Sequence, residues 1–153
     1  MANFTAVGVE DFLRYIERYG KGTEDAIPLM LNAGADVAQE AMEGTTAWSD
    51  QTGQLRRSIK RTKVMGRGSG SYIDIYPSGT TPDGQRLEEI GFVLEYGRGV
   101  SSYTRPTSTG TDKTYIIPAM DPRPWLRPAI EDNTDSIIDA MLEQWREALG
   151  SGW

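Results

Sequence analysis

The sequence predicts an α+β fold, with two N-terminal helices and a long C-terminal helix packed on a small antiparallel β-sheet. Apolar residues recur at helical spacing towards both ends of the chain, short alternating runs between turn residues occupy the middle, and a Gly/Ser/Thr-rich stretch interrupts them. The 153 residues fit one domain. We therefore treat residues 1–153 as a single domain, with residues 97–113 as a long loop, or arm, within it.

Two helices are expected in the N-terminal part. Residues 9–19 carry their apolar side chains on one face and are followed by Gly20. The second helix begins after a Gly-Lys-Gly-Thr linker, with Asp25 as its N-cap, Pro28 in its first turn and Gly44 at its end. Its apolar face is rich in small residues, so we expect another element to pack closely against it.

The middle of the chain is typical of strands and turns. Residues 58–65 and 71–76 are short β-like runs separated by Gly-Arg-Gly-Ser-Gly, which predicts a hairpin. Residues 87–96 fit either a helix or a buried strand, and their apolar spacing favours the helix. Residues 97–113 contain almost nothing to bury, and a loop of this length is usually functional or disordered. Residues 114–117 form one more predicted strand.

Three prolines precede the last predicted helix. Pro124 is expected to start that helix, because proline suits a first turn, and Pro128 is expected to kink the next turn. The apolar stripe then continues to Leu149, and Gly150 ends the helix. Trp125 and Leu126 are expected to anchor the helix to the sheet.

Composition limits the chemistry that we expect. Sixteen basic and twenty-two acidic residues give a net charge of −6, which argues against a general nucleic-acid binder. Without histidine or cysteine, the usual general base, thiolate and metal ligands are missing. The carboxylate pairs Glu88/Glu89 and Asp132/Asp135 are typical of solvated or capping groups. We expect no enzyme, no cofactor and no metal, and the sequence shows neither a signal peptide nor an apolar run that would span a membrane.

One basic run, residues 56–63, has no interleaved aromatic residue. We interpret it as an exposed strand edge guarded by cations or as a subunit contact, with direct DNA contact as the weaker alternative. Arg123 and Arg127 are assigned equally to an intersubunit or a local salt bridge.

Three motifs resemble a known family. They are Thr-Gly-Gln-Leu-Arg-Arg-Ser-Ile (52–59), Val-Leu-Glu-Tyr-Gly (93–97) and Arg-Pro-Trp-Leu-Arg-Pro-Ala (123–129). In order and spacing they resemble the head–tail joining, tail-completion proteins of long-tailed phages, a group that includes relatives of the lambda minor tail protein Z. Two departures are Arg98, where the family usually has threonine, and a longer linker before the prolines.

The resemblance implies a virion protein without catalytic activity, assembled in the host cytoplasm and located in the neck at the head–tail junction. It implies a homo-oligomeric ring, expected to be hexameric, between head-closure or connector proteins and tail-terminator or tail-tube proteins. DNA would pass through the lumen without specific binding, and the net charge predicts an acidic lumen. The alternative is a tail-terminator or minor tail component.

Two sets of residues follow from this interpretation. We expect subunit or partner contacts at the basic residues and the arm, namely Arg56, Arg57, Lys60, Arg61, Lys63, Arg98, Tyr103, Arg105, Arg123 and Arg127. We expect structural anchors within the motifs at Leu55, Ile59, Glu95, Tyr96, Gly97, Pro124, Trp125, Leu126 and Pro128.

Overall fold

The computed structural model describes Val9, Leu13, residues 25–49 and residues 51–149, and within them the fold is α+β, as predicted. The remainder of the helix expected over residues 9–19, together with Gly20 and Gly150, lies outside the described residues. The elements run, in order, α2 (Ala26–Glu43), α3 (Gln54–Arg57), β1 (Ile59–Arg61), the 3₁₀ turn η1 (Gly68–Gly70), β2 (Ile75–Pro77), α4 (Leu87–Tyr96), β3 (Ser101–Pro106), β4 (Asp112–Ile117), α5 (Leu126–Glu131) and α6 (Thr134–Leu149).

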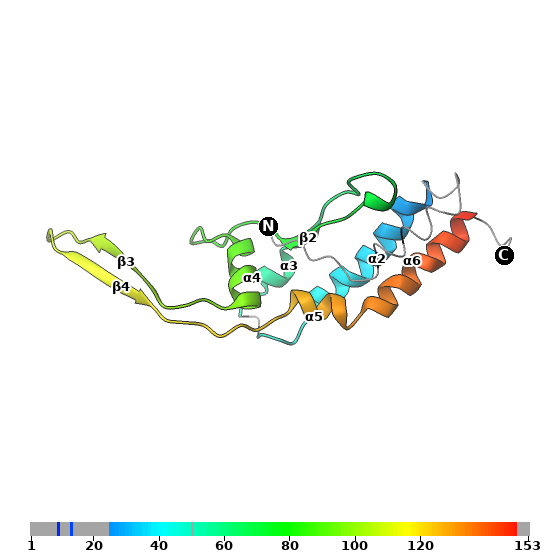
Figure 1. The fold of residues 1–153 in the computed structure, drawn as a ribbon. Coiled ribbons are helices and arrows are strands. Elements are labelled where there is room, and N and C mark those ends of the chain that lie inside the picture. The colour runs from blue at the N-terminus through cyan, green and yellow to red at the C-terminus, as the bar shows by residue number, and fades with distance from the viewer. Residues whose placement is uncertain (1–8, 10–12, 14–24, 50, 150–153) are drawn as a thin grey trace.

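Helices α2 and α6 lie side by side and form one end of the molecule (Figure 1). Their close approach depends on Gly34, where an added Cβ would stand 2.9 Å from Met141 Cγ. The small residues on α2 thus receive α6, as the sequence predicted. Gly44 ends α2, and its N–H donates to Glu40 O at 2.8 Å. Asp25 occupies the N-cap position of α2, as predicted, but its side chain makes no capping hydrogen bond.

A second core surrounds Trp125, which is 1 % exposed. Its ring meets Trp48 edge-on, with centroids 5.8 Å apart and planes at 90°. Buried side chains from the end of α2 and from α3, β1, α4 and α5 complete this cluster: Met42, Leu55, Ile59, Leu87 and Ala129. The segment before α5 is therefore packed against α3 and α4.

The described strands form two separate antiparallel pairs instead of the single expected sheet. Strands β1 and β2 pair with Lys60 opposite Tyr76, and a bridge between Met65 and Tyr72 continues the ladder towards the glycine-rich turn. This is the predicted hairpin. Strands β3 and β4 pair only with each other.

The residues that we expected to form one C-terminal helix form two. Pro124 lies before α5, and Pro128 occupies the first turn of α5, where its missing N–H breaks no helical hydrogen bond. The break falls at Asn133, whose side-chain amide donates to Ala129 O at 3.0 Å and whose carbonyl accepts Ile137 N–H at 2.9 Å. An Asn side chain that competes for backbone partners favours such an interruption.

The expected irregular loop over residues 97–113 is also corrected, because it contains all of β3 and the start of β4. Each strand contains a threonine next to a tyrosine, and β4 ends in two isoleucines; such residues favour extended backbone. The connecting turn is closed by Thr107 N–H to Thr111 O at 3.1 Å and by Gly110, which has a positive φ of 77°. Among the described helices, none is long and apolar enough to cross a bilayer.

Candidate functional site

The most distinctive surface is an arm, residues 98–120, that contains β3 and β4 (Figure 1). It projects from the rest of the described chain, which we call the body. Eleven of its twelve strand residues are exposed, and Ile117 is half-buried. The base is closed by two 2.9 Å backbone hydrogen bonds between Arg98 and Met120. Between these bonds and the turn the arm is a free-standing ribbon.

One face of the arm carries a stacked aromatic pair flanked by cations. Tyr103 lies opposite Tyr115, with ring centroids 5.2 Å apart and planes inclined by 14°. Arg105 and Lys113 form the next pair on this face, and each places its charge 5.3 Å from a tyrosine ring centroid. We call these four residues the aromatic–cationic face.

The opposite face is apolar near the body and hydroxylated farther out. Val100 and Ile116 are 70 % and 73 % exposed, and the hydroxyls of Thr104 and Thr114 are 3.1 Å apart. A two-stranded hairpin is only marginally stable alone in water. Apolar and aromatic side chains exposed on both of its faces are typical of a surface that a partner covers.

Gly97 directly precedes the arm, at a position where a side chain does not fit. Gly97 has a φ of 71°, and an added Cβ would stand 2.6 Å from Met120 O and 2.9 Å from Pro122 N. Its N–H donates to Val93 O at 2.8 Å and ends α4. The two ends of the arm meet at this contact, and only glycine fits there without strain.

A buried carboxylate on α4, just before the arm, binds the start of α5, just after it. Glu95, 2 % exposed, accepts the backbone N–H groups of Trp125 at 2.7 Å, Leu126 at 2.8 Å and Arg127 at 3.3 Å. These N–H groups open α5 and would otherwise lack partners, and their positive end suits a carboxylate. The indole N–H of Trp125 also donates to Gly91 O at 3.2 Å. The second and third motifs therefore form one structural unit.

The predicted anchors divide by burial. The buried ones are Leu55, Ile59, Glu95 and Trp125. Leu126 and Pro128 are half-buried, whereas Tyr96 and Pro124 are exposed. The Tyr96 ring lies against Phe92, with centroids 4.7 Å apart. Exposure of Tyr96 on the outside of α4 makes it a surface residue close to the start of the arm.

The structure gives Arg56 a role inside the fold. Its guanidinium donates to Glu43 O and, at 3.0 Å, to Thr45 O, and lies 4.9 Å from the Trp48 ring centroid. Two carbonyls at the end of α2 thereby gain a cationic partner, which is a common way of ending a helix. Arg56 is therefore not a free cation of the predicted basic run.

The other cations of that run differ from one another. Arg61 forms an ion pair with Asp36 of α2, and the exposed Arg57 donates to Thr52 O at 2.8 Å. Lys60 and Lys63 are exposed and have no hydrogen-bonded or ionic side-chain partner in the part of the chain that the structure describes. The run thus contributes two unengaged lysines to the surface.

The arginines that flank the arm act partly through their backbones. Arg123 N–H donates to Leu94 O at 2.6 Å, while its side chain and that of Arg127 are exposed. The Arg98 side chain donates to Pro118 O at 3.3 Å across the base of the arm. Neither Arg123 nor Arg127 forms a salt bridge with a described residue, so the local one of the two expected alternatives is absent from this region.

Sequence reasoning missed the strand partners Lys113, Tyr115 and Ile116, and also Val100. The signal that could have found them is the period-two alternation of Tyr103 and Arg105, mirrored by Lys113 and Tyr115 across a turn rich in threonine and glycine. The 97–113 boundary separated Lys113 from Tyr115 and hid this symmetry.

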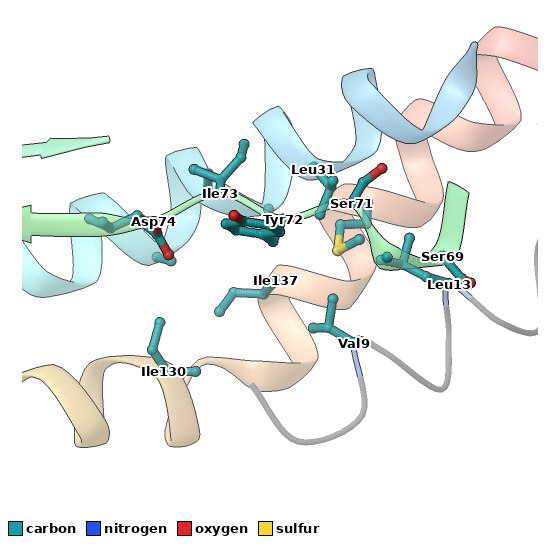
Figure 2. A pocket seen from close by; sticks show the side chains of 16 residues that line it. Val9, Leu13, Leu31, Ser69, Ser71, Tyr72, Ile73, Asp74, Ile130 and Ile137 are labelled. Atoms are coloured by element: carbon teal, nitrogen blue, oxygen red, sulfur yellow. The ribbon is translucent and has the colours of Figure 1, made fainter. Parts of the chain in front are cut away.

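The body also contains a cavity of about 310 Å³ between α2, α6 and residues 69–75 (Figure 2). Side chains such as Val9, Ile73 and Ile137 surround it, and Asp74 is the only carboxylate among its described lining residues. Across the described chain, no three potential metal-ligating side chains cluster. The cavity therefore continues the apolar core of α2 and α6, and the arm is the stronger candidate for function.

Comparison with known families shows the class of protein: residues 10–97, more than half of the chain, match the family "Bacteriophage HK97-gp10, putative tail-component". The chain belongs to this HK97 gp10-like family and is a structural component of the bacteriophage virion. No curated protein and no solved structure matches it. The family match includes the first two motifs and ends at Gly97, directly before the arm.

Proposed function

We propose that this tail component works in the phage neck. It forms a ring between the head connector and the tail tube, completes the tail, joins it to the head and leaves a channel for DNA. The observation that carries the proposal is the arm, whose two faces are exposed while its root is fastened by Glu95 and Gly97. A fixed ribbon that contacts a different surface on the next copy makes a head-to-tail interface, and such an interface gives a ring when the rotation between copies closes.

The proposed partners are further copies of the chain, head-closure or connector proteins, and tail-terminator or tail-tube proteins. Six subunits are expected from tail symmetry. The net charge of −6 supports a lumen through which DNA passes without specific binding. We assign the protein no catalytic step.

The alternative roles, tail terminator or minor tail component, are favoured by the family description, which names the tail alone. An amber mutation in the encoding phage separates these roles. A neck protein leaves DNA-filled heads and tails of normal length that do not join. Loss of a tail terminator instead gives tails of uncontrolled length, and either this result or joined particles would reject the neck assignment.

The position and the ring are tested on the virion itself. Antibody labelling in electron micrographs should mark the head–tail junction, and sedimentation of the purified protein should show a closed oligomer. Label at the distal tail tip, or a protein that remains monomeric at high concentration and is found in no ring within virions, would contradict the proposal.

A further inference from the structure

We propose that the aromatic–cationic face of the arm docks on an acidic stripe along α6 of a neighbouring copy. This inference rests on the proposed ring and names the contact that would build it. The stripe consists of Asp135, Asp139 and Glu143, which are exposed and four residues apart along one face of the helix.

The cations of the arm are available for such a contact. Arg105 and Lys113 lie side by side over the tyrosine pair and make no salt bridge with any described residue. The adjacent carboxylate, Asp112, pairs with Pro106 and belongs to the opposite face. The aromatic–cationic face is thus purely positive, in a chain whose net charge is −6.

The stripe on α6 has the complementary charge, and no basic residue that the structure describes pairs with it. Like charges at i and i+4 destabilise a helix, and Asp135, Asp139 and Glu143 form two such pairs in succession. Among the described residues, no basic side chain lies within salt-bridge distance of any of the three. Neighbouring carboxylates on the stripe are separated by about 6 Å along the helix axis. This distance is close to the roughly 5 Å between side chains that are paired across a hairpin. Two adjacent cations therefore match two adjacent carboxylates in spacing.

The geometry points to a second copy and excludes the chain's own helix. The arm and α6 lie at opposite ends of the molecule, with the body between them (Figure 1). The contacts of Gly97 and Glu95 at the base of the arm keep it pointing away from α6. The two surfaces differ, so each copy offers one arm and one stripe, and repetition of this heterologous contact gives a ring when the rotation closes.

Charge reversal on each side tests the contact. The arm variant is Arg105→Glu with Lys113→Glu, and the stripe variant is Asp139→Lys with Glu143→Lys. Each variant alone should remain folded, because all four side chains are exposed, but should weaken self-association at least tenfold in analytical ultracentrifugation. A mixture of the two variants should restore assembly, with the variants alternating in equal numbers around the ring.

The matched control is Arg67→Glu with Arg86→Glu, which changes the net charge as much as the arm variant does, on exposed side chains outside the arm and the stripe. Assembly should survive this change, and loss of assembly in the control alone would place the contact outside the arm and overturn the docking proposal. If the arm variant and the stripe variant each form rings as readily as the wild type does, the docking proposal is overturned, while the proposed ring is not. A wild-type protein that forms no ring, alone or in virions, would overturn the proposed function and the docking with it. Duplex DNA binding that the arm reversal abolishes while assembly persists would assign this face to DNA and overturn the docking.

Discussion

Glu95 Oε2 accepts the backbone N–H of Trp125 at 2.7 Å, across a separation of 30 residues. The carboxylate near the end of α4 thereby caps the start of α5, and the whole arm lies between the two residues in the sequence. The contact between α4 and α5 therefore does not depend on any residue of the arm. This relationship explains how one chain combines a packed body with an exposed ribbon of fixed direction.

Replacement of Glu95 by alanine should lower the free energy of unfolding by about 2–3 kcal/mol, because three N–H groups at the start of α5 lose a charged acceptor. Glu95→Gln should lose less, since its amide oxygen still accepts. Urea denaturation followed by tryptophan fluorescence measures both. Glu89→Ala, on the exposed side of the same helix, should change stability by less than about 0.5 kcal/mol. Equal stability of Glu95→Ala and wild type would show that the buried carboxylate does not hold α5.

Two glycines at the start of the arm should respond differently to alanine. Gly97→Ala should lower the free energy of unfolding by about 1–3 kcal/mol, because Gly97 has a positive φ and an added Cβ would press on Met120 O. Gly99→Ala should be neutral, because nothing lies within 4 Å of its added Cβ. Thermal denaturation of the pair checks this. Similar melting temperatures for the two variants would contradict the geometry of the root.

Replacement of residues 100–118 by a short Gly/Ser linker should leave the denaturation midpoint of the body close to that of wild type. The removed strand residues are almost all exposed, and Glu95 still joins α4 to α5. Head–tail joining should fail when this variant is tested for complementation of an amber phage. A full yield of infectious particles would show that the arm is dispensable.

Trp125→Ala should lower the free energy of unfolding by about 3–5 kcal/mol, because the ring is buried against Trp48 and its N–H bonds to Gly91 O. Tyr103→Ala removes an aromatic ring from the exposed arm and should leave the stability of the body unchanged. Chemical denaturation compares the two. An unchanged midpoint for Trp125→Ala would mean that the ring contributes little to the core.

The purified protein should not bind duplex DNA tightly at physiological salt. Its net charge is −6, and two cations of the basic run, Arg56 and Arg61, are occupied by Glu43 and Thr45 carbonyls and by Asp36. Electrophoretic mobility shifts over a range of salt concentrations measure this. Submicromolar affinity that falls steeply with added salt would contradict a non-adhesive lumen.

Local patterns in the sequence determined a large part of this structure. Helical spacing predicted α4 and the small-residue face of α2, and turn residues predicted the hairpin of β1 and β2. These features depend on side-chain periodicity and on backbone preferences within a few residues, so a single sequence contains them. The first two motifs likewise pointed to the phage family that matches residues 10–97.

Only the tertiary structure decided how distant residues are used. Glu95 was expected to be an anchor, but its partners at Trp125, Leu126 and Arg127 follow from how α4 meets α5. Arg56 belongs to a basic run in sequence, yet in space it ends α2. In both cases the role depends on carbonyl and N–H groups brought close by packing of the core. The energy of such contacts arises only after the chain has folded, and for that reason no local pattern in the sequence reveals them.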